Sequence, residues 1–187
     1  MSETLTKDQL DTVLQEADLL KTPEQVDDAI NQLAADLTER LQDTVPVVYT
    51  IMNGGLVLAG RLLPRLPFAL EVGYMHATRY RGDVTGSTEL QWQAPPSIPM
   101  TDRTVLILDD IFDEGHTLAA VVEACRQQGA KEVLTAVLVD KRHDRKTDEL
   151  TVDYAGMEVE DRYVFGCGMD YRGFWRNLPG IYAVKGL

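Results

Sequence analysis

The sequence predicts an α/β fold with a mainly parallel central sheet flanked by helices. Short apolar runs rich in β-branched residues alternate with segments of helical periodicity, the pattern of strands joined by crossover helices. The chain has 187 residues, 44% of them hydrophobic, which is enough for one compact core without disulfides or a structural metal. We expect a single domain over residues 1–187, made of an N-terminal helical segment (1–43), a core (44–149) and a C-terminal segment (150–187).

The N-terminal segment carries two helix-start signals. Thr6 with Gln9, and Thr22 with Gln25, fit the capping-box pattern, and Pro23 stands at a first helical position. Apolar residues then recur at helical spacing: Val26, Ile30, Leu33, Leu37 and Leu41. Because the acidic residues fall between them, we interpret the acid cluster as the solvated face of an amphipathic helix.

The core segment alternates between strands and helices. In chain order we expect a strand at 45–52, a turn at 53–55, a short helix at 56–63, a strand at 69–80, a buried strand at 105–108, a helix from Thr117 that stops at Gly129, and a buried strand at 133–139. Residues 81–103, rich in Gly and Pro, are too long for an ordinary connection and indicate either a functional flap or a disordered segment. Residues 150–187 contain short alternating pieces, typical of a small β-rich appendage.

Composition excludes several classes of partner. Lys and Arg total 18 and Asp and Glu total 30, a net charge of −12, which argues against binding nucleic acid or anionic membrane by bulk attraction. Only Cys125 and Cys167 occur, so there is no disulfide framework, and no apolar run approaches the ~20 residues of a membrane helix. We therefore expect a cytoplasmic protein. Residues 171–187 hold three basic residues and no acid, which indicates that an anion is bound locally.

The most informative stretch is residues 105–117. A buried strand leads to Asp109 and Asp110, a third acid follows at Asp113, and a glycine turn opens a helix at Thr117. Ligands of open α/β sheets bind beyond the carboxyl ends of the strands, and a turn at a helix N-terminus offers free N–H groups to phosphate. The acid pair could face hydroxyl groups or a hydrated Mg²⁺. The alternative is that these acids only cap the following helix. However, the combination of a buried strand, an acid pair, a third acid and a glycine turn into a helix is more specific than an acid pair alone.

This combination closely resembles the phosphoribosyl-diphosphate (PRPP) binding motif of the type I phosphoribosyltransferases. Further landmarks resemble its 6-oxopurine branch, the hypoxanthine-guanine phosphoribosyltransferases: residues 52–55, Arg79 with Tyr80, residues 138–141, residues 161–171 and residues 176–179. The resemblance implies the type I phosphoribosyltransferase fold, with a small hood built from the N- and C-terminal segments and a long flexible flap. It also implies an Mg²⁺-dependent enzyme that transfers the 5-phosphoribosyl group from PRPP to N9 of hypoxanthine or guanine, yielding IMP or GMP and pyrophosphate.

The resemblance also implies a role for each matching residue. Asp113 would contact purine N7 and accept a proton. PRPP ribose and 5′-phosphate would be held by Asp109, Asp110, Glu114, Gly115, His116 and Thr117, and pyrophosphate by Asn53, Gly54 and Arg176. Arg79 and Tyr80 would belong to the flap. The purine would be bound by Lys141, Tyr163, Val164 and Asp170, and Mg²⁺ by Asp109, Asp110 and Asp170. The resemblance further implies a homodimer or homotetramer.

Two other functions are also compatible with parts of the sequence. A PRPP-sensing regulator of the same fold would need a basic face for nucleic acid, which a net charge of −12 disfavours. A phosphoacceptor signalling domain would carry its acid pair after the first strand, whereas here the pair follows the third. His116 is interpreted as a loop residue, because His76 and His143 share no metal-ligand spacing with it.

Overall fold

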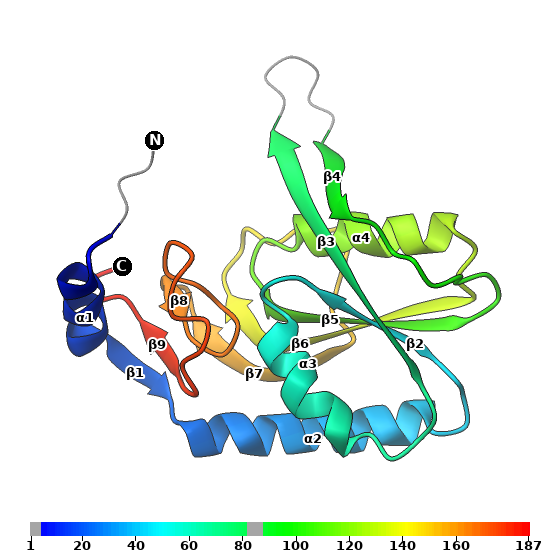
Figure 1. Ribbon diagram of the computed structural model, residues 1–187, viewed down its shortest axis with the longest axis horizontal. Helices are drawn as coiled ribbons and strands as arrows, with labels where there is room; N and C mark the ends of the chain where they lie inside the picture. The colour runs from blue at the N-terminus through cyan, green and yellow to red at the C-terminus, as the bar shows by residue number, and fades with distance from the viewer. Residues whose placement is uncertain (1–4, 82–87) are drawn as a thin grey trace.

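The computed structural model describes residues 5–81 and 88–187, which form two sheets and four α-helices (Figure 1). The elements of the large sheet are strands β2 (Val47–Ile51), β3 (Glu71–Arg81), β4 (Thr88–Ala94), β5 (Thr104–Phe112), β6 (Glu132–Arg142) and β7 (Tyr154–Glu160). Their order is β4-β3-β2-β5-β6-β7, and every neighbouring pair is parallel except β3 with β4. The predicted α/β class with a mainly parallel sheet is confirmed.

Helices cover both faces of this sheet (Figure 1). Helices α2 (Pro23–Leu41) and α3 (Leu56–Leu62, continued by a 3-10 turn, Leu63–Arg65) pack on one face, and α4 (His116–Gln127) packs on the other. Strand β5 serves both layers, since Leu106 and Leu108 join the α2 and α3 layer while Val105 and Ile107 join the α4 layer. A strand buried on both faces reads as a continuous apolar run, which is why residues 105–108 are recognisable in the sequence.

A second, three-stranded antiparallel sheet forms the predicted hood. Its order is β1 (Asp18–Lys21), β9 (Ile181–Ala183) and β8 (Val164–Phe165), and it lies beside α1 (Lys7–Glu16) where the chain ends (Figure 1). Both predicted capping boxes are present, at Thr6 and Thr22. The segment 1–43 is not purely helical as predicted, because four residues between its two helices become a strand only by pairing with distant β9.

Three further boundaries differ from prediction. Strand β5 runs through Asp109 and Asp110 to Phe112, so the acid pair lies within the strand and not after it. Strand β6 likewise extends to Arg142 and carries Lys141. Strand β7, expected in the C-terminal appendage, is instead the edge strand of the large sheet. Pairing with neighbouring strands extends β5 and β6 and places β7 in the large sheet. Local residue preferences alone determine neither the ends of a strand nor its partner.

The predicted flap, residues 81–103, is anchored at its second half. Residues 88–94 pair with β3, Trp92 packs against the α4-side core, and Met100 is fully buried there. The hydroxyl of Tyr49 accepts the N–H of Ile98 at 2.6 Å and donates to its carbonyl at 3.0 Å. Residues 82–87 and the side chains of Arg79 and Tyr80 lie outside the described part of the structure, so there the flap stays a prediction. In the described ranges, no helix combines the length and the apolar character that crossing a membrane requires.

Candidate active site

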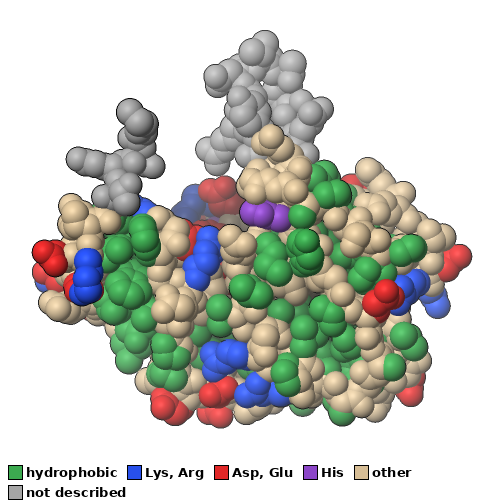
Figure 2. Space-filling model, in the orientation of Figure 1, with side chains coloured by type: hydrophobic (Ala, Val, Ile, Leu, Met, Phe, Trp, Pro, Cys, Tyr) green, Lys and Arg blue, Asp and Glu red, His purple; other side chains and the backbone are tan. Residues whose placement is uncertain are grey.

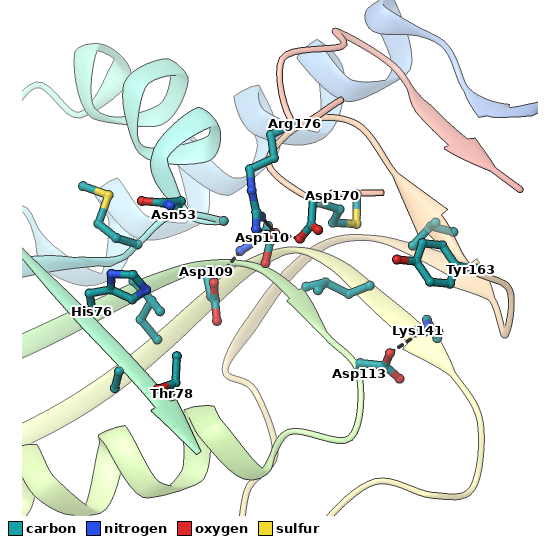
Figure 3. A pocket seen from close by; sticks show the side chains of 17 residues that line it. Asn53, His76, Thr78, Asp109, Asp110, Asp113, Lys141, Tyr163, Asp170 and Arg176 are labelled. Carbon is teal, nitrogen blue, oxygen red and sulfur yellow. Dashed lines mark hydrogen bonds and ion pairs between the residues drawn. The ribbon is translucent and has the colours of Figure 1, made fainter. Parts of the chain in front are cut away.

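A pocket of about 440 Å³ opens between the carboxyl ends of the central strands and the hood, and a second hollow of about 550 Å³ adjoins it. Figure 2 shows this face hollowed beside the hood, with acidic and basic side chains together in the recess. Most of the predicted residues line the first pocket: Asn53, Gly54, Asp109, Asp110, Asp113, Lys141, Tyr163, Val164, Asp170 and Arg176 (Figure 3). Residues 114–117 line the second hollow, which also shares Asp109, Asp110 and Asp113. The fold therefore brings together residues that lie far apart in the sequence, from Asn53 to Arg176.

Asp109 and Asp110 lie at the centre of the pocket, on adjacent positions of β5 (Figure 3). Asp110 is only 7% exposed, and its backbone N–H donates to Oδ1 of Asp109 at 3.0 Å. Burial, followed by the charge of Asp110, raises the pKa of Asp109 well above its ordinary value, and burial raises that of Asp110. Two neighbouring carboxylates with raised pKa values, Asp110 buried and Asp109 half-buried, are a pair that a cation or hydroxyl donors would stabilise.

Arg176 reaches down onto this acid pair from the C-terminal loop (Figure 3). Its guanidinium lies 2.6 Å from Oδ1 of Asp170, 3.9 Å from Oδ2 of Asp110, and donates to the carbonyl of Gly168 at 2.6 Å. The other oxygen of Asp170 accepts the N–H of Gly173 at 2.6 Å. Both oxygens of Asp170, a predicted metal ligand, are therefore engaged by protein groups.

Close backbone contacts hold the two loops around Asp110. The Met52–Asn53 peptide bond is cis, and the following residue, Gly54, lies against the Asp110 carboxylate with no room for a side chain. A Cβ added at Gly168 would overlap the carbonyl oxygen of Gly54, and Gly168 has φ +109°, a conformation that other residues rarely adopt. Only glycine at both positions lets the pyrophosphate-loop candidate and the C-terminal loop meet at the acid pair.

We expect Gly168→Ala to lower the free energy of unfolding by at least ~2 kcal/mol, because it combines the backbone cost with an overlap on Gly54. PRPP affinity should fall with it, since Gly54 would be displaced. Gly173→Ala is the matched control: its φ of +91° is similar, but no atom of the described residues lies within 4 Å of the added Cβ. Urea unfolding and PRPP titration of both variants test this, and equal losses in the two would contradict the role of the contact.

The α4 N-terminus forms the second hollow. Gly115, the N-cap residue, has φ +81°, and no side chain in the described part of the chain caps the helix. A Cβ at Gly115 would also overlap the ring of Phe112, so the turn requires glycine. The first N–H groups of a helix with no capping side chain, with the positive end of the helix dipole, suit a phosphate group.

At the other end of the pocket, Asp113 is held by two donors. Lys141 Nζ lies 2.7 Å from Oδ2 and His143 Nε2 lies 2.6 Å from Oδ1. Burial alone raises the pKa of Asp113, but these hydrogen bonds and the nearby positive charge outweigh it and hold the pKa below its ordinary value. Lys141 is predicted to donate to the purine; in this structure its ammonium instead contacts Asp113, across the space where a ligand would enter.

Aromatic and apolar groups cover the same end. Tyr163 is 42% exposed and packs edge-on against Tyr171, with ring centroids 5.7 Å apart. Val164, on β8, is buried and lines the pocket. An exposed aromatic face beside a lysine and a carboxylate is a suitable site for a planar polar ring.

The acid pair is the candidate metal site. Across residues 5–81 and 88–187, no three His, Cys, Asp or Glu side chains are grouped to hold a metal by themselves. Asp109 and Asp110 offer hard carboxylate oxygens, and Mg²⁺ is commonly held by one or two carboxylates together with substrate oxygens and water. These residues therefore fit Mg²⁺ bound along with a phosphorylated substrate.

Sequence reasoning missed three polar residues of this region. His76 and Thr78 line the first pocket from β3, and His143 contacts Asp113 from just beyond β6. The alternation along 69–80 places His76 and Thr78 on one face of the strand, but nothing local indicates that this face borders a pocket. His143 carries no spacing signal, because its partner lies 30 residues earlier in the chain.

Comparison with known proteins agrees with this geometry. A family model described as a phosphoribosyl transferase domain matches residues 17–172. The chain is 33% identical over 167 residues to hypoxanthine-guanine phosphoribosyltransferase of Bacillus subtilis (89% of this chain, 92% of the relative). It is 32% identical over 186 residues to hypoxanthine-guanine-xanthine phosphoribosyltransferase of Tritrichomonas foetus (99% of this chain, 97% of the relative).

A crystal structure of hypoxanthine phosphoribosyltransferase from Staphylococcus aureus superposes with a TM-score of 0.86 at 28% identity, covering 93% of this chain and 95% of that one. The parallel sheet with its hood, the acid pair at its centre and these similarities along nearly the whole chain show that it belongs to the phosphoribosyltransferase family of enzymes, as a homologue of the hypoxanthine-guanine phosphoribosyltransferases.

Proposed function

We propose that the protein transfers the 5-phosphoribosyl group from PRPP to N9 of hypoxanthine or guanine, yielding IMP or GMP and pyrophosphate in purine salvage. The observation that carries this proposal is that the two ends of the pocket carry different chemical groups. An acid pair, of which Asp110 is buried, lies at one end between two loops suited to anions, and a Lys141–Asp113 pair beside an exposed tyrosine lies at the other. A sugar that bears a 5′-phosphate and a pyrophosphate, together with a 6-oxopurine, are the substrates that match these two ends.

The sugar end suits departure of pyrophosphate from an anomeric carbon. Positive charge develops on the ribose ring as the bond breaks, and the carboxylates of Asp109 and Asp110 would stabilise it. Arg176 and the backbone around Asn53 and Gly54 would bind the negative pyrophosphate, while the N–H groups of residues 114–117 would hold the 5′-phosphate. Each role matches a group that lines the corresponding hollow.

Mg²⁺ would be held by Asp109 and Asp110 together with substrate oxygens, and when bound it would neutralise charge on the leaving pyrophosphate. Asp170 is also proposed as a ligand. That role requires Arg176 to release Oδ1 of Asp170, because the guanidinium now lies 2.6 Å away. Pyrophosphate would offer the guanidinium an alternative partner.

The base end suits a purine with a 6-oxo group. Lys141 would donate to O6, Tyr163 would stack on the ring, and backbone groups near Val164 and Asp170 would contact the remaining edge. Adenine presents an amino group at that position, which cannot accept from an ammonium. Asp113 would contact N7 and accept its proton. When the purine binds, Lys141 would move its hydrogen bond from Asp113 to O6, and the loss of this donor would increase the proton affinity of Asp113.

The test is incubation with PRPP, MgCl₂ and each of hypoxanthine, guanine, xanthine and adenine, measuring nucleotide and pyrophosphate together. We expect IMP and GMP, no AMP, and loss of product with EDTA that excess Mg²⁺ restores. Absence of product from all three 6-oxopurines would overturn the proposal. Binding of PRPP without turnover would then favour a PRPP-sensing regulator. The homodimer or homotetramer and the cytoplasmic location stay predictions, which sedimentation and imaging of the tagged protein would check.

A further inference from the structure

His143 has an unusual position for a residue with no role in binding either substrate. It directly follows β6, and its side chain is only 2% exposed. Its Nε2 lies 2.6 Å from Oδ1 of Asp113, while Nδ1 accepts the backbone N–H of Arg145 at 3.1 Å. Among the described residues that line the pocket, Lys141 and Asp113 are present and His143 is not. The imidazole therefore contacts the carboxylate from behind, away from the ligand space.

These two contacts determine which ring nitrogen faces Asp113 as a donor. A ring nitrogen that accepts an N–H uses its lone pair in that bond, so Nδ1 is the acceptor of the ring. Nε2 is then the nitrogen that donates a hydrogen bond to Oδ1 of Asp113.

The loop that carries His143 is itself attached to the phosphate loop and the hood. The N–H of Thr147 donates to the carbonyl of Glu114 at 2.9 Å, one residue beyond Asp113. The guanidinium of Arg145 binds both oxygens of Asp161, at 2.7 and 2.9 Å. Because the loop is fixed at both points, the imidazole is held in place independently of Asp113.

The two donors on Asp113 differ in what they can do when substrate arrives. Lys141 has a flexible stem and faces the pocket, so it can exchange Asp113 for the purine O6. His143 is enclosed and has no other acceptor in the contacts described for it. We propose, resting on the proposed function, that His143 is a positioning residue, which keeps Oδ1 of Asp113 in place and leaves Oδ2 free to face purine N7 once Lys141 departs.

The charged groups around Asp113 make this role measurable. Two groups contact its carboxylate: Lys141 on β6, and His143 just after this strand. Arg145, paired with Asp161, contacts the far side of the His143 ring through its backbone N–H. The acid pair of β5 lines the same pocket as Asp113. Of these, only Lys141 and His143 donate hydrogen bonds to the carboxylate. Removing the imidazole donor should therefore raise the pKa of Asp113, because one of the bonds that favour its ionised form is lost.

Two substitutions separate the two bonds of the ring. In His143→Asn the side-chain oxygen can still accept the N–H two residues on, as asparagine does in turns, but the amide is too short to reach Asp113. In His143→Gln the terminal NH₂ can occupy the place of Nε2 and restore the donor. We expect kcat with hypoxanthine to fall about 10- to 100-fold in His143→Asn, with the KM for PRPP little changed, and to recover largely in His143→Gln.

Spectroscopy distinguishes positioning from a merely structural role. In ¹³C NMR titrations of the free enzyme, the Asp113 carboxyl should titrate at higher pH in His143→Asn than in wild type and return in His143→Gln. Long-range ¹H–¹⁵N spectra should show the Nε2–H tautomer of His143. An unchanged kcat in His143→Asn, an unmoved Asp113 titration, or an Nδ1–H tautomer would each overturn the proposal. If wild type makes no nucleotide, the proposed function fails, and the titration and tautomer still decide whether His143 holds Asp113.

Discussion

Asp113→Asn is expected to lower kcat with hypoxanthine by about 10²- to 10⁴-fold, the usual contribution of a general base. Asparagine has nearly the same shape and keeps an oxygen that can accept from Lys141 or His143, but it cannot take a proton from the purine. The dissociation constant for PRPP should change much less, because the acid pair and the two loops proposed to bind its phosphates are untouched. Steady-state kinetics and PRPP titration of the same preparation measure both quantities.

The control for this variant is Asp148→Asn, which removes one negative charge from an exposed residue of the loop after β6. It should behave as wild type in both measurements. Equal losses of kcat and of PRPP affinity in Asp113→Asn would argue that Asp113 binds substrate and does not transfer a proton.

Asp113→Asn should also change how stability depends on pH. The folded state lowers the pKa of Asp113, so its ionised form stabilises the fold above the ordinary aspartate value, and that contribution disappears as the pH falls through the lowered value. The variant lacks this contribution at neutral pH. Wild type and variant should therefore differ in melting temperature at pH 7 and converge as the solution is acidified.

Lys141→Met is expected to lower kcat/KM for hypoxanthine by about 100-fold, since the charged donor proposed for O6 is lost. The side chain of Lys141 is only 10% exposed, and methionine fills a similar volume, so the fold should persist. The KM for PRPP should change little. The variant should also raise the pKa of Asp113, because it removes the donor to Oδ2.

An exposed lysine supplies the comparison for this variant. Lys131→Met removes the same charge at the start of β6, far along the strand from the pocket, and should leave kcat/KM unchanged. Adenine should be a poor substrate for all three proteins. A Lys141→Met enzyme that uses hypoxanthine as well as wild type would show that O6 is recognised by another group.

Particular elements show how far the sequence could predict the fold. The capping boxes at Thr6 and Thr22 and the helical repeat behind Pro23 are local signals, and both helices form where these signals predict. Strand β1 has no such signal: it is a strand because Ile181–Ala183 lies beside it. The limits of β5 and β6 differ from prediction for a similar reason: pairing with β6 carries β5 past the acid pair to Phe112, and pairing with β7 carries β6 to Arg142.

For the site, the motif at residues 105–117 and its spacing identified the acid pair, the glycine turn and Asp113, and the other landmarks supplied residues that now line the same pocket. Contacts among them were beyond prediction. That Lys141 pairs with Asp113, that Arg176 engages Asp170, and that His143 lies behind the carboxylate all depend on side chains that meet across different loops.

The sequence by itself therefore determined the class of fold, the family and the set of residues at the sheet's carboxyl edge. These depend on periodicity and short motifs, which are carried by neighbouring residues. Only the tertiary structure decided which partner each charged group has, and with it the direction in which the pKa values of Asp109, Asp110 and Asp113 shift. Those shifts depend on burial and on distances of a few ångströms between residues far apart in the chain, such as the 2.6 Å from His143 to Asp113.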